Sequence, residues 1–360
     1  MNSKERVRKT FKHEKTDRVP INYFANGDID RRLKEHFGLA INDNDGLLEK
    51  LGVDFRGINA PYKGKPLFDR TGVPDDVSVD PVWGIRTKWV KHESGGYQDF
   101  CDFPLKDATL EDIENWPMPN PDDYDYTYVK TLTEKYKDYA LHVGNPGLGD
   151  NMNSLGMIFG TERVYMALAL DDEAVLRYMD RRKEIMVEIA RRTIEAANGQ
   201  IDFIWLGEDL GTQRGALISL DTFRKHIRPK LQSFVDLAKE YNLPVLIHSC
   251  GSSSWAFNDF LEMGITGVDT LQPEAKNMSP EYLLKTFGDK FCYHGCISTA
   301  GPLAYGTVDE VSDYCKKTLD TMMPYGGYMF SPTHSIQDNS PTENVLKMYE
   351  VGKDYGRYAK

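Results

Sequence analysis

Short apolar runs alternate with longer amphipathic stretches along most of this chain, and this alternation constrains its fold more than any other feature. Such an order is typical of α/β proteins, in which helices pack against a parallel sheet. Eight of the runs have the length and the β-branched or aromatic content of strands. They cover residues 18–24, 53–58, 139–145, 201–209, 243–251, 267–273, 291–299 and 327–335.

Helical patterns fill most of the intervals between the later runs. The clearest covers residues 171–198, where Met179, Met186 and Ile189 recur at helical spacing among charged positions. Asp171 is the expected N-cap of this helix, and Asn198 followed by glycine is expected to end it. Further helices are predicted at residues 221–240, 255–263, 279–287, 308–323 and 341–353.

Eight strands, most of them followed by a helix, predict a (β/α)8 TIM barrel in a chain of 360 residues. No glycine-rich dinucleotide fingerprint follows any strand, which disfavours an open doubly wound sheet. Residues 77–110 have the pattern of a β-hairpin inserted after the second strand, with a turn at residues 94–96. Because no linker, low-complexity tract or internal repeat interrupts the chain, we expect residues 1–360 to form one domain.

Composition excludes several classes of protein. A formal charge of −11 disfavours nucleic acid as a partner. No run approaches the roughly 18 apolar residues of a membrane span, and the charged amino terminus lacks the apolar stretch of a signal peptide, so we expect a cytoplasmic protein without a membrane partner. The five cysteines are an odd number without the spacing of a disulfide scaffold, which favours reduced thiols or metal ligation.

The fifth predicted strand carries the strongest functional signal. In a barrel the reactive side chains lie at the carboxyl ends of the strands, and this strand ends with His248 and Cys250. Residues two apart on a strand share a face, so both side chains can converge on one metal ion. Either residue alone could equally be a buried core residue. Together they favour a zinc site, because catalytic zinc takes three ligands from His, Cys and carboxylate.

Two residues compete for the third ligand position. His334 ends the eighth strand, and Cys296 lies in the seventh, where Cys292, His294 and Cys296 are expected to alternate onto one face. We take His334 as the first choice and Cys296 as the alternative. Cys292 is interpreted as core, and His294 as a structural residue or as a partner of a ligand.

Several long segments then make the chain recognisable. The run HSCGSSSWAFNDFLEMGITGVDTLQPEAKNM, followed by FGDKFCYHGCIST and GGYMFSPTHSIQDNSPTENV, resembles the uroporphyrinogen decarboxylase superfamily, and particularly its methylcobamide-dependent methyltransferase branch. The segments KERVRKTFKHEKTDRVPINYF and GEDLGTQRGALIS are also similar, so the resemblance covers nearly the whole chain. It implies a (β/α)8 barrel that binds Zn²⁺ and exchanges a methyl group with cobalamin carried on a partner corrinoid protein.

The resemblance implies that zinc is bound by a His-x-Cys pair, here His248 and Cys250, and by a later cysteine, whose place is taken here by His334. Coordination to zinc lowers the pKa of a thiol substrate, and coordination of a methyl ether stabilises the leaving alkoxide. Replacing a thiolate ligand by histidine makes zinc a stronger Lewis acid, which favours a methoxylated aromatic substrate over a thiol.

Other strand-end residues are candidates for the substrate site. Glu208 and Asp209 end the fourth strand and could act as general acid, as zinc ligand or as partner of His248, or could form a structural ion pair. Four aromatic residues at strand ends could line a flat pocket or belong to the core. They are Tyr23, Trp205, Tyr293 and Phe330.

Two other function classes stay open at this stage. A metal-free decarboxylase would need an Arg or Lys cluster at the barrel mouth, but the arginine-rich amino-terminal segment of the decarboxylases is replaced here by INYFANGDID. A binding protein on the same scaffold would hold zinc or a corrinoid without turnover. In each case the chain could assemble as a homodimer.

Overall fold

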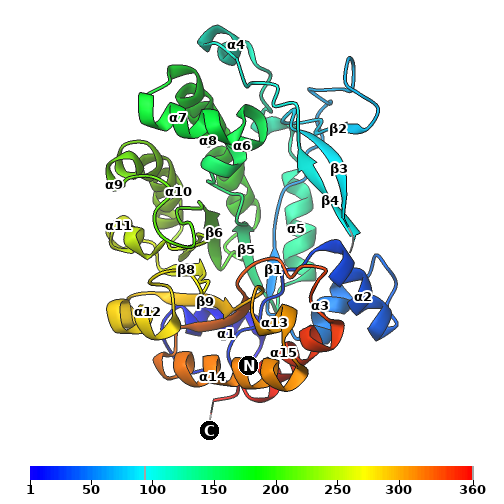
Figure 1. Cartoon of the computed structure of the whole chain (residues 1–360), viewed down its shortest axis with the longest axis vertical. Helices are drawn as coiled ribbons and strands as arrows, with labels where there is room; N and C mark the ends of the chain where they lie inside the picture. Colours follow the sequence, from blue (N-terminus) through cyan, green and yellow to red (C-terminus); the bar gives the residue numbers. More distant parts are fainter. Residues whose placement is uncertain (93–94, 359–360) are drawn as a thin grey trace.

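The structure is a computed structural model that describes residues 1–92 and 95–358. Its centre is a curled parallel sheet in which the described residues form seven strands, in the order β1-β5-β6-β7-β8-β9-β10 (Figure 1). All neighbouring strands pair in parallel. The strands are β1 Phe55–Gly57, β5 Ala140–Gly144, β6 Phe203–Gly207, β7 Val245–His248, β8 Gly267–Thr270, β9 Cys292–Ile297 and β10 Tyr328–Pro332.

The first predicted strand is replaced by a short segment that connects the two edges of this sheet. The Phe330 N–H of β10 donates to the Pro20 carbonyl over 2.8 Å, and the Asn22 N–H donates to the Phe330 carbonyl over 2.9 Å. On the other edge, the Asp54 N–H donates to the Ile21 carbonyl over 2.9 Å. Pro20 has no N–H, and the Ile21 N–H donates to the Asp54 side chain, so no continuous ladder forms here.

Alternation along the strands divides the side chains of the sheet into two sets. One set points to the inside of the curl and forms a small inner cluster, and the other packs against the surrounding helices in a much larger cluster. This division decides which strand residues can reach a site inside the curl. The inner cluster consists of Val7, Phe55, Ala140, Phe203, Trp205, Leu246, Cys292 and Met329.

The longest helix, α8 Glu173–Ala196, confirms the predicted helix in this region but begins one residue later than expected. Its N-cap is Asp172, whose side chain accepts hydrogen bonds from the backbone of Ala174 and Val175. Asp171 instead ends α7 Thr161–Leu170 in the left-handed conformation, at φ 58°. The two adjacent aspartates therefore serve two different helices.

The other predicted helices are confirmed. They correspond to α9 Leu220–Thr222, a π turn at Phe223–Ile227 and α10 Arg228–Glu240, then α11 Phe257–Met263, α12 Pro280–Phe287, α14 Val308–Met322 and α15 Thr342–Asp354. The remaining α-helices are α1 Ser3–Thr10, α2 Gly27–Phe37, α3 Asn44–Leu51, α4 Leu110–Asn115, α5 Tyr126–Lys135, α6 Met152–Phe159 and α13 Pro302–Tyr305. Short 3-10 turns cover Pro121–Asp123, Ser254–Ala256, Gly288–Lys290 and Met323–Tyr325. Within the described residues, none of the helices combines the length and the apolar character needed to cross a bilayer.

A second, antiparallel sheet lies between β1 and β5 in the chain. It has three strands in the described residues, β2 Val77–Val79, β3 Arg86–His92 and β4 Gly95–Phe100, so the predicted hairpin describes only part of it. The predicted turn falls partly on residues 93–94, which lie outside the described residues. Figure 1 shows this sheet at the end of the molecule away from α14 and α15.

Candidate metal centre

Three polar residues lie side by side on neighbouring strands inside the curl. The register pairs His248 of β7 with Asp269 of β8, and Asp269 with His294 of β9. Parallel strands in this register carry the three side chains at one level, and all three are buried. Buried polar groups need partners, and these three side chains find them in one another and in adjacent residues.

Asp269 connects the two histidines. Its Oδ2 lies 2.7 Å from Nδ1 of His248, and its Oδ1 lies 2.5 Å from Nδ1 of His294. Trp205 Nε1 also donates to Oδ2 over 3.2 Å. Burial alone would raise the pKa of Asp269, but the charges of His294 and His248 and their hydrogen bonds hold it well below its ordinary value. Asp269 is therefore a carboxylate that fixes the orientation of both imidazole rings.

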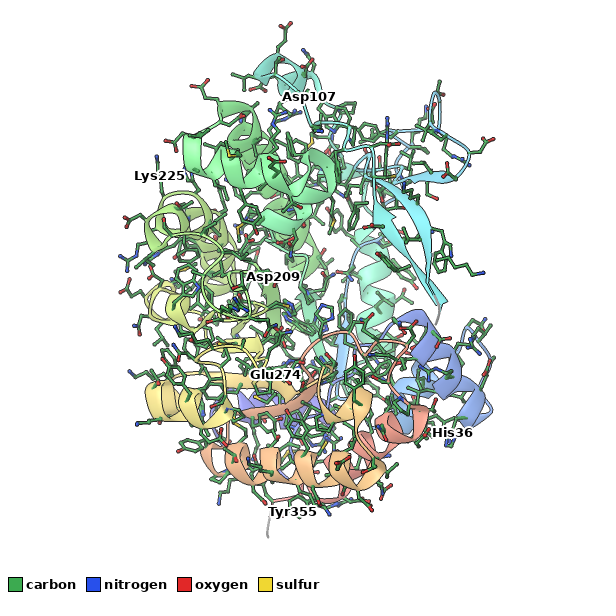
Figure 2. All side chains as sticks on the ribbon, viewed as in Figure 1. His36, Asp107, Asp209, Lys225, Glu274 and Tyr355 are labelled. Atoms are coloured by element: carbon green, nitrogen blue, oxygen red, sulfur yellow. The ribbon has the colours of Figure 1, made fainter. Side chains whose placement is uncertain are left out.

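Nδ1 of His248 lies 2.7 Å from Oγ1 of Thr270 as well as from Asp269, so Nε2 is the ring nitrogen that His248 presents to Cys250 and Asp209. It lies 3.3 Å from Sγ of Cys250 and 3.8 Å from Oδ1 of Asp209. Among the described residues, Asp209, His248 and Cys250 form a group whose candidate ligand atoms all lie within 4.8 Å of one another. We call these three residues the donor cluster. Figure 2 shows its member Asp209 near the middle of the molecule.

The loops after β6 and β7 bring the donor cluster together. The Cys250 N–H donates to Oδ1 of Asp209 over 2.8 Å, and Nδ2 of Asn153 donates to Oδ2 over 2.8 Å. Gly251 follows Cys250 at φ 69°, and a Cβ there would stand 2.2 Å from the Gly211 carbonyl oxygen. Only glycine permits this close approach of the two loops.

The donor cluster fits a zinc ion in both geometry and chemistry. Bond lengths to tetrahedral zinc place a sulfur and a nitrogen ligand about 3.5 Å apart, close to the separation of the Cys250 and His248 atoms. Burial raises the pKa of the Cys250 thiol, while His248 lowers it. A bound cation would favour the thiolate, and the mixture of sulfur, nitrogen and oxygen donors suits zinc better than a hard cation.

Glu208, the neighbour of Asp209, lies outside the donor cluster. Its carboxylate accepts hydrogen bonds from the backbone N–H groups of Asn151 and Met152 and from Nδ2 of Asn151. These bonds hold the start of α6. Burial, followed by the nearby Asp150 charge, raises the pKa of Glu208. Glu208 therefore faces the start of α6, whereas Asp209 faces Cys250.

Neither of the two predicted third ligands belongs to the donor cluster in the described residues. His334 is exposed, although it lines the same small cavity as His248. Cys296 is buried among the outward-facing core residues, and burial raises the pKa of its thiol. The expected alternation of β9 breaks because Gly295 and Cys296 have φ values of 117° and 67°, which turns Cys296 away from the face that carries Cys292 and His294. Asp209 is the described residue that offers a third ligand atom within 4.8 Å of those of His248 and Cys250.

Of the four predicted aromatic residues, Trp205 alone lines this cavity. Tyr23, Tyr293 and Phe330 belong to the outer side of the sheet, where they pack in or against the large core. Tyr23 Oη donates to Asp30 and Tyr293 Oη to the Gly288 carbonyl. The cavity is lined by Phe24, Pro146, Trp205, His248, Asp269, His294, Ser331, Pro332, Thr333 and His334.

Sequence reasoning missed Asp269 and the neighbours of the inner histidines. Nδ2 of Asn22 lies 3.1 Å from Nε2 of His294, and Phe24 replaces Tyr23 at the cavity. Strand alternation could have found these residues, because Asn22 and Phe24 flank Tyr23 on the opposite face. Asp269 also had a signal, since it is an acid inside a predicted strand.

Comparisons with known proteins agree with this architecture. Two curated relatives are similar to the chain. The methylcobamide:CoM methyltransferase MtbA of Methanosarcina acetivorans is 24% identical over 246 residues, which cover 62% of this chain and 68% of the relative. The uroporphyrinogen decarboxylase of Bacillus cytotoxicus is 23% identical over 375 residues, covering 99% of this chain and 98% of the relative.

A methyltransferase from Methanosarcina mazei has the same fold, with a TM-score of 0.63, 18% identity and 99% of both chains covered. The uroporphyrinogen decarboxylase (URO-D) family pattern matches residues 104–355, a stretch that includes all three residues of the donor cluster. The chain therefore belongs to the uroporphyrinogen decarboxylase family.

Proposed function

We propose that the protein is a zinc-dependent methyltransferase that moves a methyl group between a small methylated substrate and the cobalamin of a corrinoid protein. The observation that carries this proposal is the donor cluster of Asp209, His248 and Cys250 at the carboxyl ends of β6 and β7. The similarity to a methylcobamide:CoM methyltransferase supports the reaction class. The same end of the sheet is where barrel enzymes place their chemistry.

The residues of the chain have distinct roles in this proposal. Asp209, His248 and Cys250 would hold the zinc, and Asp269 would keep Nε2 of His248 directed at it. When bound, zinc supplies Lewis acidity toward a substrate oxygen or sulfur. Trp205 forms the wall beside Asp269 and presents an aromatic surface to the cavity. Glu208 positions α6 and does not contact the reacting groups.

The donor set favours a methoxylated aromatic substrate over a thiol. In this proposal Asp209 is the third zinc ligand instead of the predicted His334. Its carboxylate carries the same formal charge as a second thiolate but donates less electron density, so the zinc would stay a stronger Lewis acid than one bound by two thiolates. Cleavage of a methyl aryl ether depends on that Lewis acidity, because the aryloxide is a poor leaving group without it.

Metal content is the first test. We expect about one zinc per chain in the purified protein and loss of zinc in His248→Ala, Cys250→Ala and Asp209→Ala. Cys296→Ala and Glu208→Gln are the matched controls, because each removes a ligand-type side chain that lies outside the donor cluster. Zinc lost in Cys296→Ala and retained in Asp209→Ala would restore the cysteine as the third ligand.

Turnover is the second test. In one assay the zinc-loaded protein is mixed with a Co(I) corrinoid protein and a methoxylated aromatic compound, and formation of methyl-cobalt is followed by absorbance. In the other it is mixed with the methylated corrinoid protein and a thiol, and loss of methyl-cobalt is followed. We expect methyl transfer that requires zinc and disappears in Cys250→Ala. Zinc binding without transfer to or from either substrate class would favour a binding protein.

Full-length similarity to a uroporphyrinogen decarboxylase makes metal-free decarboxylation the second candidate. The carboxylated substrates of a decarboxylase need cationic partners. None of the described residues that line the small cavity beside His248, here called the central cavity, is Arg or Lys. Protein that contains no zinc and releases CO2 from a carboxylated tetrapyrrole would replace the first proposal with this one.

A further inference from the structure

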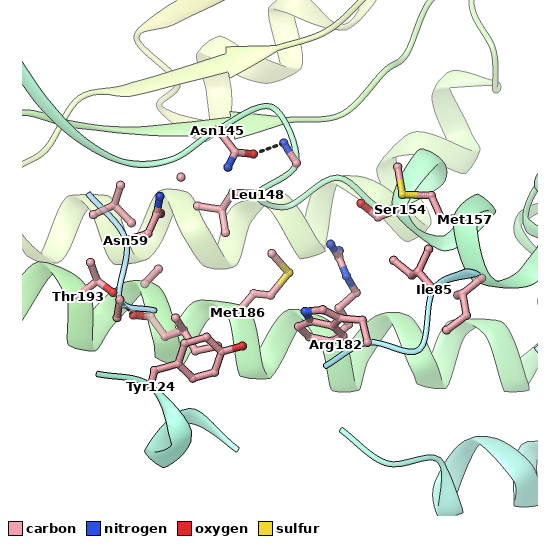
Figure 3. A pocket seen from close by; sticks show the side chains of 18 of the residues that line it. Asn59, Ile85, Tyr124, Asn145, Leu148, Ser154, Met157, Arg182, Met186 and Thr193 are labelled. Atoms are coloured by element: carbon pink, nitrogen blue, oxygen red, sulfur yellow. Dashed lines mark hydrogen bonds between the residues drawn. The ribbon is translucent and has the colours of Figure 1, made fainter. Parts of the chain in front are cut away.

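A larger cavity lies outside the curled sheet, along one face of α8 (Figure 3). We call it the α8 cavity. It has a volume of about 450 Å3, within the range of sites for small organic ligands. Its walls are mainly aromatic, aliphatic and thioether groups. They include Trp83, Tyr124, Met186 and Ala190.

Arg182 is the cationic residue in this apolar wall. Figure 3 shows its side chain reaching from α8 into the space between Met186 and Ser154. Nη1 donates to the Asp150 backbone carbonyl over 2.8 Å, and the guanidinium carbon lies 5.7 Å from the centre of the Trp83 ring. Within the described residues, no side-chain carboxylate accepts a hydrogen bond from Arg182. Several N–H donors of the Arg182 guanidinium therefore remain available to a ligand in the cavity.

The nearest acids are committed elsewhere. The Asp150 carboxylate accepts hydrogen bonds from the Ser154 N–H over 2.7 Å and from its hydroxyl over 2.6 Å. Glu208 accepts from the first residues of α6, as described above. Burial lowers the pKa of Arg182, which reflects the free-energy cost of holding a guanidinium in this apolar surrounding. An anion that enters the cavity would remove much of that cost.

We infer that the α8 cavity binds a small monocarboxylate with a flat apolar body. The carboxylate would accept a forked hydrogen bond from Arg182, since a guanidinium matches the two oxygens of a carboxylate. The body would lie against Trp83, Tyr124 and Met186, whose rings and thioether suit a flat hydrocarbon. One arginine in an apolar wall suits a monoanion better than a phosphate, which requires more donors.

The α8 cavity and the donor cluster share a wall. Asn145 and Gly147 line the α8 cavity, whereas Pro146 between them lines the central cavity beside His248. The Gly147 N–H donates to Oδ1 of Asn145 over 2.7 Å, which closes this turn on itself. A ligand in the α8 cavity would therefore contact the turn that forms one side of the proposed zinc site.

Titration calorimetry with 2-naphthoate as the probe tests this site on the full chain. We expect saturable binding of 2-naphthoate, and affinity at least about tenfold lower for the neutral 2-naphthamide, because the amide loses the charged hydrogen bonds. Arg182→Met is expected to reduce the affinity for 2-naphthoate by about the same factor. Arg177→Met is the matched control, since Arg177 also lies on α8 but pairs with Glu114 outside the cavity.

Two further variants keep the result interpretable. Ala190→Phe is expected to abolish binding by filling the cavity while leaving Arg182 in place, which covers the case in which Arg182→Met fails to fold. His248→Ala is expected to bind 2-naphthoate like the unchanged protein, because the proposed zinc site is separate. The inference would be overturned if the unchanged protein did not bind 2-naphthoate, or if it bound 2-naphthamide equally well. It would also be overturned if binding were lost in His248→Ala but kept in Arg182→Met.

Discussion

Asp269 illustrates how one buried carboxylate orders two histidines. Each of its oxygens is engaged by a different imidazole, and both rings are nearly inaccessible to solvent. A carboxylate behind a ligating histidine fixes which ring nitrogen faces the metal and increases its basicity. The same reasoning makes Asp269 the residue that should influence the zinc site without touching the metal.

Replacing Asp269 should weaken zinc binding. We expect Asp269→Asn to lower zinc affinity by about 10- to 100-fold, measured by competition with a chromophoric chelator. Asp171→Asn is a suitable control, because Asp171 also contacts a histidine, His226, far from the donor cluster in the sequence. Equal zinc affinities in the unchanged protein and Asp269→Asn would remove the positioning role.

His142 should contribute to the pH dependence of the unfolding free energy. Burial lowers the pKa of this inner histidine from 6.5 to about 4, and its Nδ1 lies 2.9 Å from the Gly144 carbonyl oxygen. Between about pH 4 and about pH 6.5 the unfolded chain therefore binds a proton at His142 that the folded chain does not bind. This contribution to stability is complete above about pH 6.5 and is lost as pH falls to about 4.

We therefore expect His142→Gln to flatten the pH dependence of the unfolding free energy between about pH 5 and about pH 7, by about 2 kcal/mol. Urea unfolding at about pH 5 and about pH 7 gives the difference for each protein. His36→Gln, which changes an exposed histidine, should keep the slope of the unchanged protein. An unchanged slope in His142→Gln would show that His142 titrates normally.

At the scale of elements, β9 shows how a local backbone feature decides which side chains reach a site. Gly295 and Cys296 both have positive φ, and this places Cys296 on the outer side of the sheet. A strand that alternated regularly would have carried Cys296 to the same face as His294. The irregular strand end therefore keeps Cys296 out of the donor cluster.

Gly295→Ala should reveal how tightly this feature is held. A Cβ at Gly295 would stand 2.2 Å from the Thr270 carbonyl oxygen, so β8 and β9 would have to separate. We expect destabilisation of more than about 2 kcal/mol in urea unfolding. Gly38→Ala shares the positive φ but has no heavy atom within 4 Å, and it should cost only about 1 kcal/mol. Equal losses in both variants would contradict the close contact.

For the whole molecule, the amino-terminal segment connects the two edges of the curled sheet, and Asp54 fixes it there. The buried Asp54 carboxylate accepts hydrogen bonds from Arg6, Arg18, the Ile21 N–H and the Ser3 hydroxyl. These partners belong to α1 and to the segment before α2, whereas Asp54 immediately precedes β1. The Asp54 carboxylate thus connects the amino-terminal segment to the start of β1.

Asp54→Ala should destabilise the protein by about 3–5 kcal/mol, because it leaves Arg6 and Arg18 without a buried counter-charge. Urea unfolding measures the loss. Asp17→Ala removes the other partner of Arg6, but this carboxylate is 47% exposed and should cost much less. Comparable losses in the two variants would show that Asp54 is not the main connection.

The sequence alone determined most strands of the central sheet, the later helices and the pairing of His248 with Cys250. Apolar periodicity predicted seven of the parallel strands and the helices between the later ones, because burial of one face is a local property of the pattern. His248 and Cys250 were found because they share a strand and a face. The tertiary structure alone decided the rest: the positive φ values that turn Cys296 outward, the register that places Asp269 between two histidines, and the loop contact that brings Asp209 to Cys250. These features depend on contacts between residues distant in the chain, which a local pattern does not encode.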